Sequence, residues 1–205
     1  MADSALPMVL SAVQALYGME GAERQREANE FLHTFAASDM AWSVGFQLLQ
    51  DKSLALSSEA LFFAANMLHT KVRKEWVRLP ADQKGALTMS LQMLISNSRD
   101  SMQPAIHQRP LANKLCAIYA VVMISSPDDC SALLSRLLAN CSSASAEEIS
   151  FLLIFARCIC EEIEDAELSF AVKDAMEIHL SALSDDIVSL IEKIVLTKED
   201  QDVSH

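Results

Sequence analysis

Residues 58–76, SEALFFAANMLHTKVRKEW, carry two stripes at helical spacing where an ordinary surface helix carries one apolar stripe. The first stripe is apolar and consists of Ala60, Leu61, Ala64, Met67, Leu68 and Val72. The second is neither plainly apolar nor plainly charged and consists of Glu59, Phe62, Asn66, His69 and Arg73. The pattern predicts a helix with one buried side and a second side whose role depends on its neighbours.

The same periodicity, interrupted by Gly, Pro and polar clusters, predicts about nine helices along the chain. Their expected ranges are 5–17, 22–37, 40–50, 58–76, 82–97, 104–124, 127–140, 143–164 and 166–196. Ser145 and Glu148, three residues apart, are typical of a capping box at the start of the eighth helix.

Polar residues and one proline mark the starts of three other helices. Ser38 or Asp39 is expected to N-cap the third helix, and Ser57 or Ser58 the fourth. Pro127 stands where the first turn of the seventh helix is expected, a position that tolerates its missing N–H group. These signals predict the ends of the helices independently of the apolar stripes.

The spacing of the helices indicates a repeat. Alternate helices begin near residues 5, 39, 81, 127 and 166, so one helix pair recurs about every 34 to 46 residues, as in HEAT and armadillo repeats. We therefore predict an all-α, right-handed α-solenoid of HEAT-like antiparallel helix pairs over residues 1–196, with about four pairs and part of a fifth. Residues 197–205 are expected to form a frayed tail. A compact helical bundle is the competing interpretation.

The composition agrees with this class. Hydrophobic residues make up 51% of the 205 residues, with only 4 Gly and 5 Pro, so a sizeable helical core is expected and no sheet. The apolar runs are too short to cross a bilayer. With no secretory signal, the five cysteines are expected to be reduced thiols inside a cell.

The net charge of −12 is concentrated late in the chain. Residues 145–205 contain 15 acidic and 4 basic residues, whereas 13 acidic and 12 basic residues precede them. Such a segment repels phosphates and makes direct nucleic acid binding unexpected. It would suit a basic partner, although a solvated helix face is the simpler explanation. Basic residues gather at Lys71, Arg73, Lys74 and Arg78, where they also complement a helix dipole.

Signatures of catalysis are not recognised in the sequence. It contains no phosphate-binding glycine loop, no GxSxG and no HExxH, and its five histidines stand on separate predicted elements. The cysteines of RCIC are two residues apart, too far around a helix to clamp a metal together. We expect no catalytic residues, no metal, no cofactor and no enzymatic activity.

Four segments in order resemble a known family: VQALYG, EANEFLHTF, AWSVGFQLLQ and FFAANMLHTKV. They are similar to the amino-terminal region of importin-β superfamily nuclear transport receptors, the karyopherins, and most closely to the transportin-SR branch. RLPAD and EEISFLLIFARCICEEIED continue the likeness, although the latter lacks the proline of the family segment. Receptors of this family are several times longer, so the chain is expected to be an amino-terminal piece.

The resemblance implies a function in protein import into the nucleus, with shuttling between cytoplasm and nucleus. Receptors of this kind bind the GTP form of the small GTPase Ran through the inner helices of their first repeats, and they contact Phe-Gly repeats of nucleoporins. Typical cargoes of the transportin-SR branch are arginine/serine-rich splicing factors, held mainly further along the superhelix. A helical-repeat scaffold or adaptor unrelated to transport is the alternative, and a regulatory subunit of an enzyme is a third.

Within the solenoid the second, fourth and sixth helices are the inner ones, and their mixed faces are the candidate surface for Ran. The candidate residues are Arg26, Glu30, His33, Glu59, Phe62, Asn66, His69, Arg73, Arg109 and Asn113. Phe62 is the leading candidate, because an exposed aromatic side chain near Asn66 and Arg73 is typical of an interface anchor. The same ring would also suit a wedge between two repeats.

Overall fold

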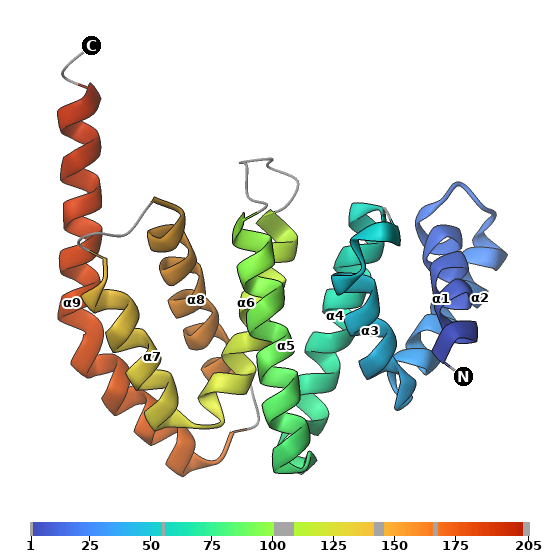
Figure 1. Ribbon diagram of the computed structural model, residues 1–205, viewed down its shortest axis with the longest axis horizontal. Coiled ribbons are helices and arrows are strands. Elements are labelled where there is room, and N and C mark those ends of the chain that lie inside the picture. The colour runs from blue at the N-terminus through green and yellow to red at the C-terminus, as the bar shows by residue number, and fades with distance from the viewer. Residues whose placement is uncertain (1, 55, 101–108, 142–145, 166–167, 203–205) are drawn as a thin grey trace. The chain divides into compact units, whose positions relative to one another are not determined.

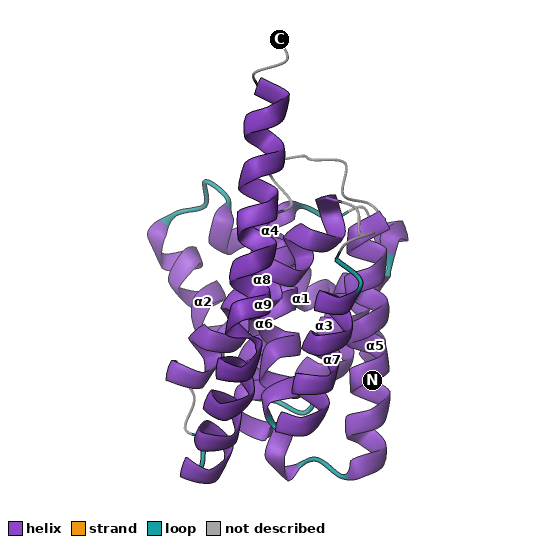
Figure 2. Cartoon of the chain, turned by 90° about the vertical axis from the view of Figure 1, so that its left-hand side faces the viewer, coloured by secondary structure: helices purple, strands orange, loops and turns teal. Residues whose placement is uncertain are grey.

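A computed structural model describes residues 2–54, 56–100, 109–141, 146–165 and 168–202. Within these ranges the chain forms α-helices, short 3₁₀ turns and connecting loops, without a strand (Figure 2). The helices in chain order are α1 (Ala2–Tyr17), α2 (Ala22–Ala36), α3 (Met40–Gln50), α4 (Ser58–Glu75), α5 (Ala81–Asp100), α6 (Arg109–Ile124), α7 (Pro127–Ala139), α8 (Ala146–Asp165) and α9 (Phe170–Asp202). Two 3₁₀ turns, η1 (Lys52–Leu54) and η2 (Trp76–Arg78), follow α3 and α4. The predicted all-α class is confirmed.

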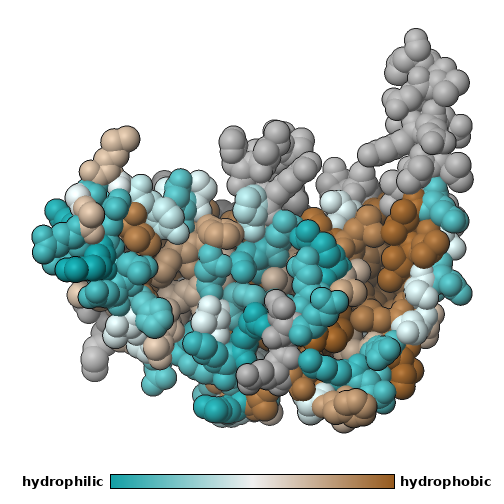
Figure 3. All heavy atoms as spheres, turned by 180° about the vertical axis from the view of Figure 1, so that it is seen from behind, coloured by the Kyte–Doolittle hydropathy of each residue, from teal (hydrophilic) through white to brown (hydrophobic). Residues whose placement is uncertain are grey.

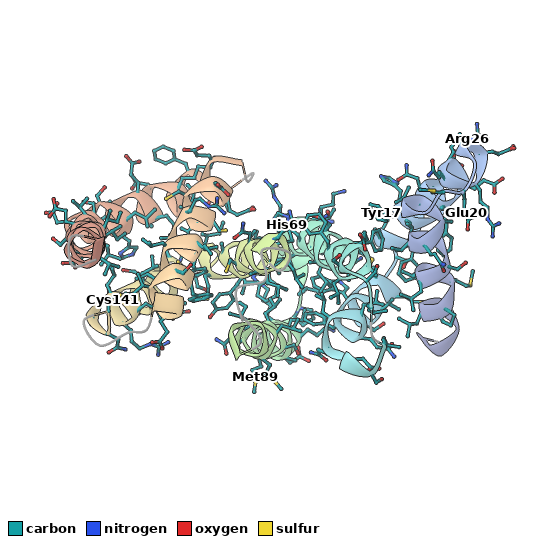
Figure 4. All side chains as sticks on the ribbon, turned by 90° about the horizontal axis from the view of Figure 1, so that it is seen from above. Tyr17, Glu20, Arg26, His69, Met89 and Cys141 are labelled. Carbon is teal, nitrogen blue, oxygen red and sulfur yellow. The ribbon has the colours of Figure 1, made fainter. Side chains whose placement is uncertain are left out.

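The chain divides into two compact units, Met1–Val122 and Met123–His205. In the first unit α1 packs against α2 and α3 packs against α4 (Figure 1). The side-chain amide of Gln92 on α5 donates to the Tyr119 hydroxyl on α6 at 3.0 Å. Viewed from above, α4 and α6 lie in one layer with His69, whereas α5 and its Met89 lie in the other (Figure 4). The HEAT-like pairing of successive helices is thereby confirmed.

The core at the start of this unit is built by α1 to α4, because each contributes an apolar stripe to the same interior. Its buried members are Ala5, Leu6, Val9, Val13, Leu32, Val44, Leu48, Ala60 and Ala64. Partly buried aromatic and aliphatic side chains close its margin, among them Phe31, Phe35 and Phe63. The rings of Phe31 and Phe35 stack one helical turn apart, with centroids separated by 6.1 Å.

The predicted helix starts had different outcomes. The Ser57 hydroxyl accepts a hydrogen bond from the Ala60 amide at 3.3 Å, so Ser57 is the N-cap of α4 as predicted. Pro127 is in the first turn of α7, also as predicted. Asp39 is the N-cap residue of α3, one of the two predicted positions, but the expected side-chain capping bond is not formed. The Ser38 hydroxyl donates backwards to the Phe35 carbonyl at 2.7 Å, at the end of α2.

The last helix differs from its predicted range. It begins at Phe170 and not at residue 166, because the Ser169 hydroxyl accepts from the Val172 amide at 3.4 Å and caps the helix there. It continues to Asp202, so helix extends into the segment for which a frayed tail was expected. The capping box at Ser145 and the predicted start of the sixth helix at residue 104 lie outside the described residues.

A glycine sets the closest approach of α3 to α4. A Cβ atom at Gly45 would lie 2.8 Å from Cγ and Cδ2 of Leu68 and 3.1 Å from Cε of Met67. Leu68 is fully buried, so it has little room to move aside. Because Gly45 has no side chain, the Leu68 and Met67 side chains of α4 can pack directly against the backbone of α3.

We expect Gly45→Ala to destabilise the first unit by about 1–2 kcal/mol, because overpacking outweighs the better helix propensity of alanine. Gly85→Ala on α5 is the matched control, since a Cβ atom there would meet nothing within 4 Å. That control should stabilise by up to about 1 kcal/mol. Both tryptophans, Trp42 and Trp76, belong to this unit, so urea unfolding followed by tryptophan fluorescence measures both variants. Equal shifts for the two alanines would contradict the close approach.

The second unit is centred on α7, which packs against both α8 and α9. Its interior includes Cys130, Leu134, Phe155 and Met176, all essentially without solvent exposure. At the start of α7, Asp128 Oδ1 lies 3.2 Å from His179 Nε2 of α9. These contacts join all three helices of the unit.

Apolar side chains also gather on the outside of the second unit, where Figure 3 shows them in brown. Ile178, Val188 and Ile191 of α9 are exposed, as is Phe170 at its first residue. Exposed apolar surface of this kind is typical of interaction surfaces. Among the described residues no helix is both long and apolar enough to span a membrane.

Candidate partner-binding surface

The apolar stripe predicted for α4 is buried in the structure. Ala60, Ala64, Met67, Leu68 and Val72 are all buried, and Leu61 is half-buried. The spacing of the apolar residues therefore identified the side of α4 that packs into the core.

A pocket of about 380 Å³ lies where the end of α1 meets α2 and α4. Its inner wall is apolar and includes Leu16 of α1, Leu32 of α2, and Phe63 and Met67 of α4. Leu32 and Met67 are buried, so this wall is continuous with the core. The pocket is therefore a hollow on a rigid framework of three helices.

Polar side chains line the rest of the pocket. Asn29 and His33 come from α2, and Asn66, Thr70 and Lys74 come from α4. Tyr17, at the end of α1, projects between α2 and α4 (Figure 4). The Thr70 hydroxyl donates to the Asn66 carbonyl of its own helix at 3.1 Å. An apolar wall with a few convergent polar groups is the usual composition of a binding pocket.

Two of the ten predicted surface residues, His33 and Asn66, line this pocket. The remaining members of the predicted stripe on α4 are not among its lining residues. The α4 residues that line the pocket are 63, 66, 67, 70, 71, 74 and 75.

His69 lies on the other side of α4, toward α6. Its Nδ1 atom is 3.4 Å from the Lys114 ammonium, and the residue is only 8% exposed (Figure 4). Because the lysine can only donate, Nδ1 accepts in this contact and a neutral ring carries its proton on Nε2. His69 thus links two inner helices of the first unit.

Phe62 is half-buried and not fully exposed as expected, so both of its predicted roles, anchor and wedge, stay open. Glu59 is exposed in the first turn of α4. Hydrogen bonds from a backbone amide and from the Ser57 hydroxyl lower the pKa of Glu59 below 4.5, so its carboxylate stays charged near neutral pH.

The other predicted residues lie at separate places on the inner helices. Arg26 and Glu30 are exposed on α2, with Nε and Oε1 4.0 Å apart, a surface pair of little energetic weight. Arg73 is exposed on α4, and Asn113 is half-buried on α6. Arg109 is the first residue of α6, and its side chain lies outside the described part of the chain.

A charge network that was not predicted from the sequence includes two residues of the pocket lining, Lys71 and Glu75. Lys71 is 2% exposed, and its ammonium lies 2.6 Å from Glu75 Oε1. The Trp42 indole N–H of α3 donates to Glu75 Oε2 at 3.0 Å. The Lys71–Glu75 spacing of four residues was visible in the sequence. The sequence did not show that Lys71 is buried, or that Trp42 of α3 is a third member of the network.

This network determines the ionisation of Glu75. Partial burial opposes the charged form, but hydrogen bonds from Lys71 and Trp42 and the charges of Lys71 and Arg78 outweigh it. The pKa of Glu75 is therefore lowered from its ordinary value of 4.5. The carboxylate and the buried ammonium form a fixed ion pair at the base of the pocket.

Four of the five cysteine thiols are held in their neutral form by burial. Burial raises the pKa of Cys130 to about 12 and also raises the pKa values of Cys141, Cys158 and Cys160. Since the thiolate is the reactive form, these thiols are poorly suited to covalent catalysis. Within the described ranges, no group of three His, Cys, Asp or Glu side chains is placed to hold a metal ion.

The geometry defines a helical-repeat protein whose first unit presents a pocket and mixed polar faces suited to binding another macromolecule. Residues 28–102 match the model of the importin-beta N-terminal domain family. This match begins in α2 and extends through α3, α4 and α5, so it includes the α4 side of the pocket.

Two curated proteins are similar to this chain. An uncharacterized protein of Schizosaccharomyces pombe, C11G11.07, is 34% identical over 99 residues, which are 48% of this chain and 10% of that protein. Importin-13 of Bos taurus is 28% identical over 127 residues, 62% of this chain and 12% of that protein. The chain spans about a tenth of the length of these relatives. Over residues 28–102 the chain is therefore similar to the importin-β superfamily, to which the name of the bovine relative also points.

Proposed function

We propose that this chain is the Ran-binding part of a nuclear import receptor of the transportin-SR type. The observation that carries the proposal is the importin-beta N-terminal domain match over α2 to α5, which includes two of the three helices that line the pocket, α2 and α4. In this family the amino-terminal domain binds Ran in its GTP form. The inner helices α2, α4 and α6 form the contact surface in this proposal.

The proposed mechanism is a coupling of two binding events. Ran-GTP binding weakens cargo binding, and by thermodynamic reciprocity cargo weakens Ran binding to the same extent. GTP hydrolysis belongs to Ran, so this chain makes and breaks no bond. The proposed cargoes are arginine/serine-rich proteins held mainly beyond this chain, and weak contacts with nucleoporin Phe-Gly repeats carry the receptor between cytoplasm and nucleus.

The decisive test is a pull-down of this chain with Ran held in its GTP or its GDP form. We expect retention of the GTP form alone. A folded chain that shows no preference for GTP would overturn the proposal and favour the alternative of a scaffold unrelated to transport.

A paired substitution locates the surface. Phe62→Ala combined with Asn66→Ala should weaken Ran-GTP binding at least tenfold, because it removes an aromatic contact and a polar contact from α4. Met89→Ala with Met93→Ala is the matched control, since both methionines are exposed on α5 in the opposite layer. The control should bind Ran-GTP as the parent chain does. Unchanged helicity by circular dichroism establishes that both variants are folded, and equal binding by the two would place the contact elsewhere.

A further inference from the structure

The pocket between α1, α2 and α4 contains one charge that the surrounding structure does not neutralise. Lys71 and Glu75 compensate each other at 2.6 Å, and the second oxygen of Glu75 accepts from Trp42. Lys74, one residue from Glu75 in sequence, also lines the pocket and is exposed. It forms no ion pair with any residue that the structure describes. The pocket therefore carries a net positive charge.

This positive charge is local, because the protein as a whole carries a net charge of −12. The four basic residues near the end of α4 serve different purposes. Lys71 is buried in its pair with Glu75, and the Arg78 charge acts on the same carboxylate. Lys74 is the member of this group that is both exposed and part of the pocket lining. A cation that lines a pocket selects its ligand by both charge and shape, whereas a cation on an open helix face selects by charge alone.

The remaining polar groups of the pocket are also available to a ligand. The side chains of His33 and Asn29 form no hydrogen bond with the described residues. The apolar part of the lining includes Leu32 and Met67, which are both buried. A volume of about 380 Å³ is enough for a large side chain together with a stretch of backbone.

We propose that this pocket binds an acidic peptide segment of a protein partner, with one large apolar side chain against Leu32 and Met67 and a carboxylate beside Lys74. The apolar side chain supplies the contact area and the anchor. The carboxylate matches the one uncompensated charge of the pocket, and peptide backbone groups match Asn29 and His33. The inference rests on the proposed function in that the pocket lies on the helices assigned to partner binding, and it adds the chemistry of the segment recognised.

The test is a titration of the whole chain, carrying [ε-¹³C]methionine, with three acetylated pentapeptides. They are Glu-Glu-Phe-Glu-Glu, Glu-Glu-Ala-Glu-Glu and Lys-Lys-Phe-Lys-Lys. The Met67 methyl resonance, assigned by Met67→Leu, reports on the pocket wall, and the Met89 and Met93 resonances report on the opposite layer. We expect a saturable shift of Met67 with the first peptide alone, and no shift of Met89 or Met93.

The Lys74→Glu variant isolates the charge. Lys74→Glu should weaken the binding of the first peptide at least tenfold. Lys173→Glu, at the start of α9 in the second unit, should leave the affinity for this peptide unchanged. No saturable Met67 shift with the acidic phenylalanine peptide would overturn the inference, as would an equal shift with the basic peptide. Ran is absent from this titration. If the chain binds Ran-GTP but not the peptide, the proposed pocket chemistry alone is refuted. If it binds the peptide but shows no GTP-dependent Ran binding, the Ran proposal alone is refuted.

Discussion

Phe155→Ala is expected to lower the free energy of unfolding of the second unit by about 3–5 kcal/mol, the largest effect that we predict for a single substitution. Phe155 on α8 has 0% exposure, and its ring stacks on that of Phe151 with centroids 5.9 Å apart and planes at 4°. Truncation removes the transfer free energy of a whole ring and leaves a cavity in a close-packed interior.

Phe170→Ala is the matched control, because Phe170 belongs to the same unit and is 84% exposed. It should change the stability by less than about 0.5 kcal/mol. Urea unfolding followed by circular dichroism compares the two variants, and amide hydrogen exchange in α7 and α8 assigns the loss to this unit. A loss below about 1 kcal/mol for Phe155→Ala would show that the surrounding helices collapse into the cavity.

Glu75→Gln is expected to destabilise the first unit by about 2–3 kcal/mol. The substitution leaves the ammonium of Lys71 buried without its counter-charge, and breaking a fully buried pair costs about 3–5 kcal/mol. The cost here is smaller because the Glu75 side chain is about one third exposed, at 32%, and the glutamine amide can still accept from Trp42. Tryptophan fluorescence during urea unfolding measures it.

The control for Glu75→Gln is Glu161→Gln on α8. Glu161 also pairs with a base four residues earlier, but Arg157 Nε is 3.6 Å away and both side chains are more than half exposed. Removing this pair should cost less than about 0.5 kcal/mol. Similar losses for the two glutamines would show that burial of Lys71 adds nothing to the strength of its pair.

The same pair predicts a pH dependence. Since the pKa of Glu75 in the folded chain is lowered from 4.5, its contribution is complete above about pH 4.5 and is lost as the pH falls through the lowered value. The stability difference between the parent chain and Glu75→Gln should therefore shrink below pH 4.5. A difference that stays constant from pH 7 to pH 3 would contradict the assignment of the charge to Glu75.

Residues close in sequence determine most features of α4. Its apolar stripe, its N-cap at Ser57 and its extent follow from residues close in sequence, and all three were predicted. Which residues of α4 line the pocket was not predicted, apart from Asn66. The rotation of a helix about its own axis depends on what it packs against, and here Gly45 of α3 allows Leu68 and Met67 to approach closely.

Local signals failed where a side chain had two possible partners. Ser38 had the residue type and position of an N-cap for α3, but its hydroxyl bonds to the preceding helix. Lys71 belonged to a basic run explained by the helix dipole, yet it is buried with Glu75 and Trp42. In both cases the choice depends on the geometry of a neighbouring helix or turn, which residue types alone do not specify.

The sequence by itself determined the all-α class, the approximate positions of the helices, the buried face of α4 and the resemblance to nuclear transport receptors. These properties depend on periodicity and on short segments, which are written along the chain. The tertiary structure decided which polar residues share a surface. His33, Asn66, Lys74 and Tyr17 come from three helices, and their meeting in one pocket depends on how those helices pack.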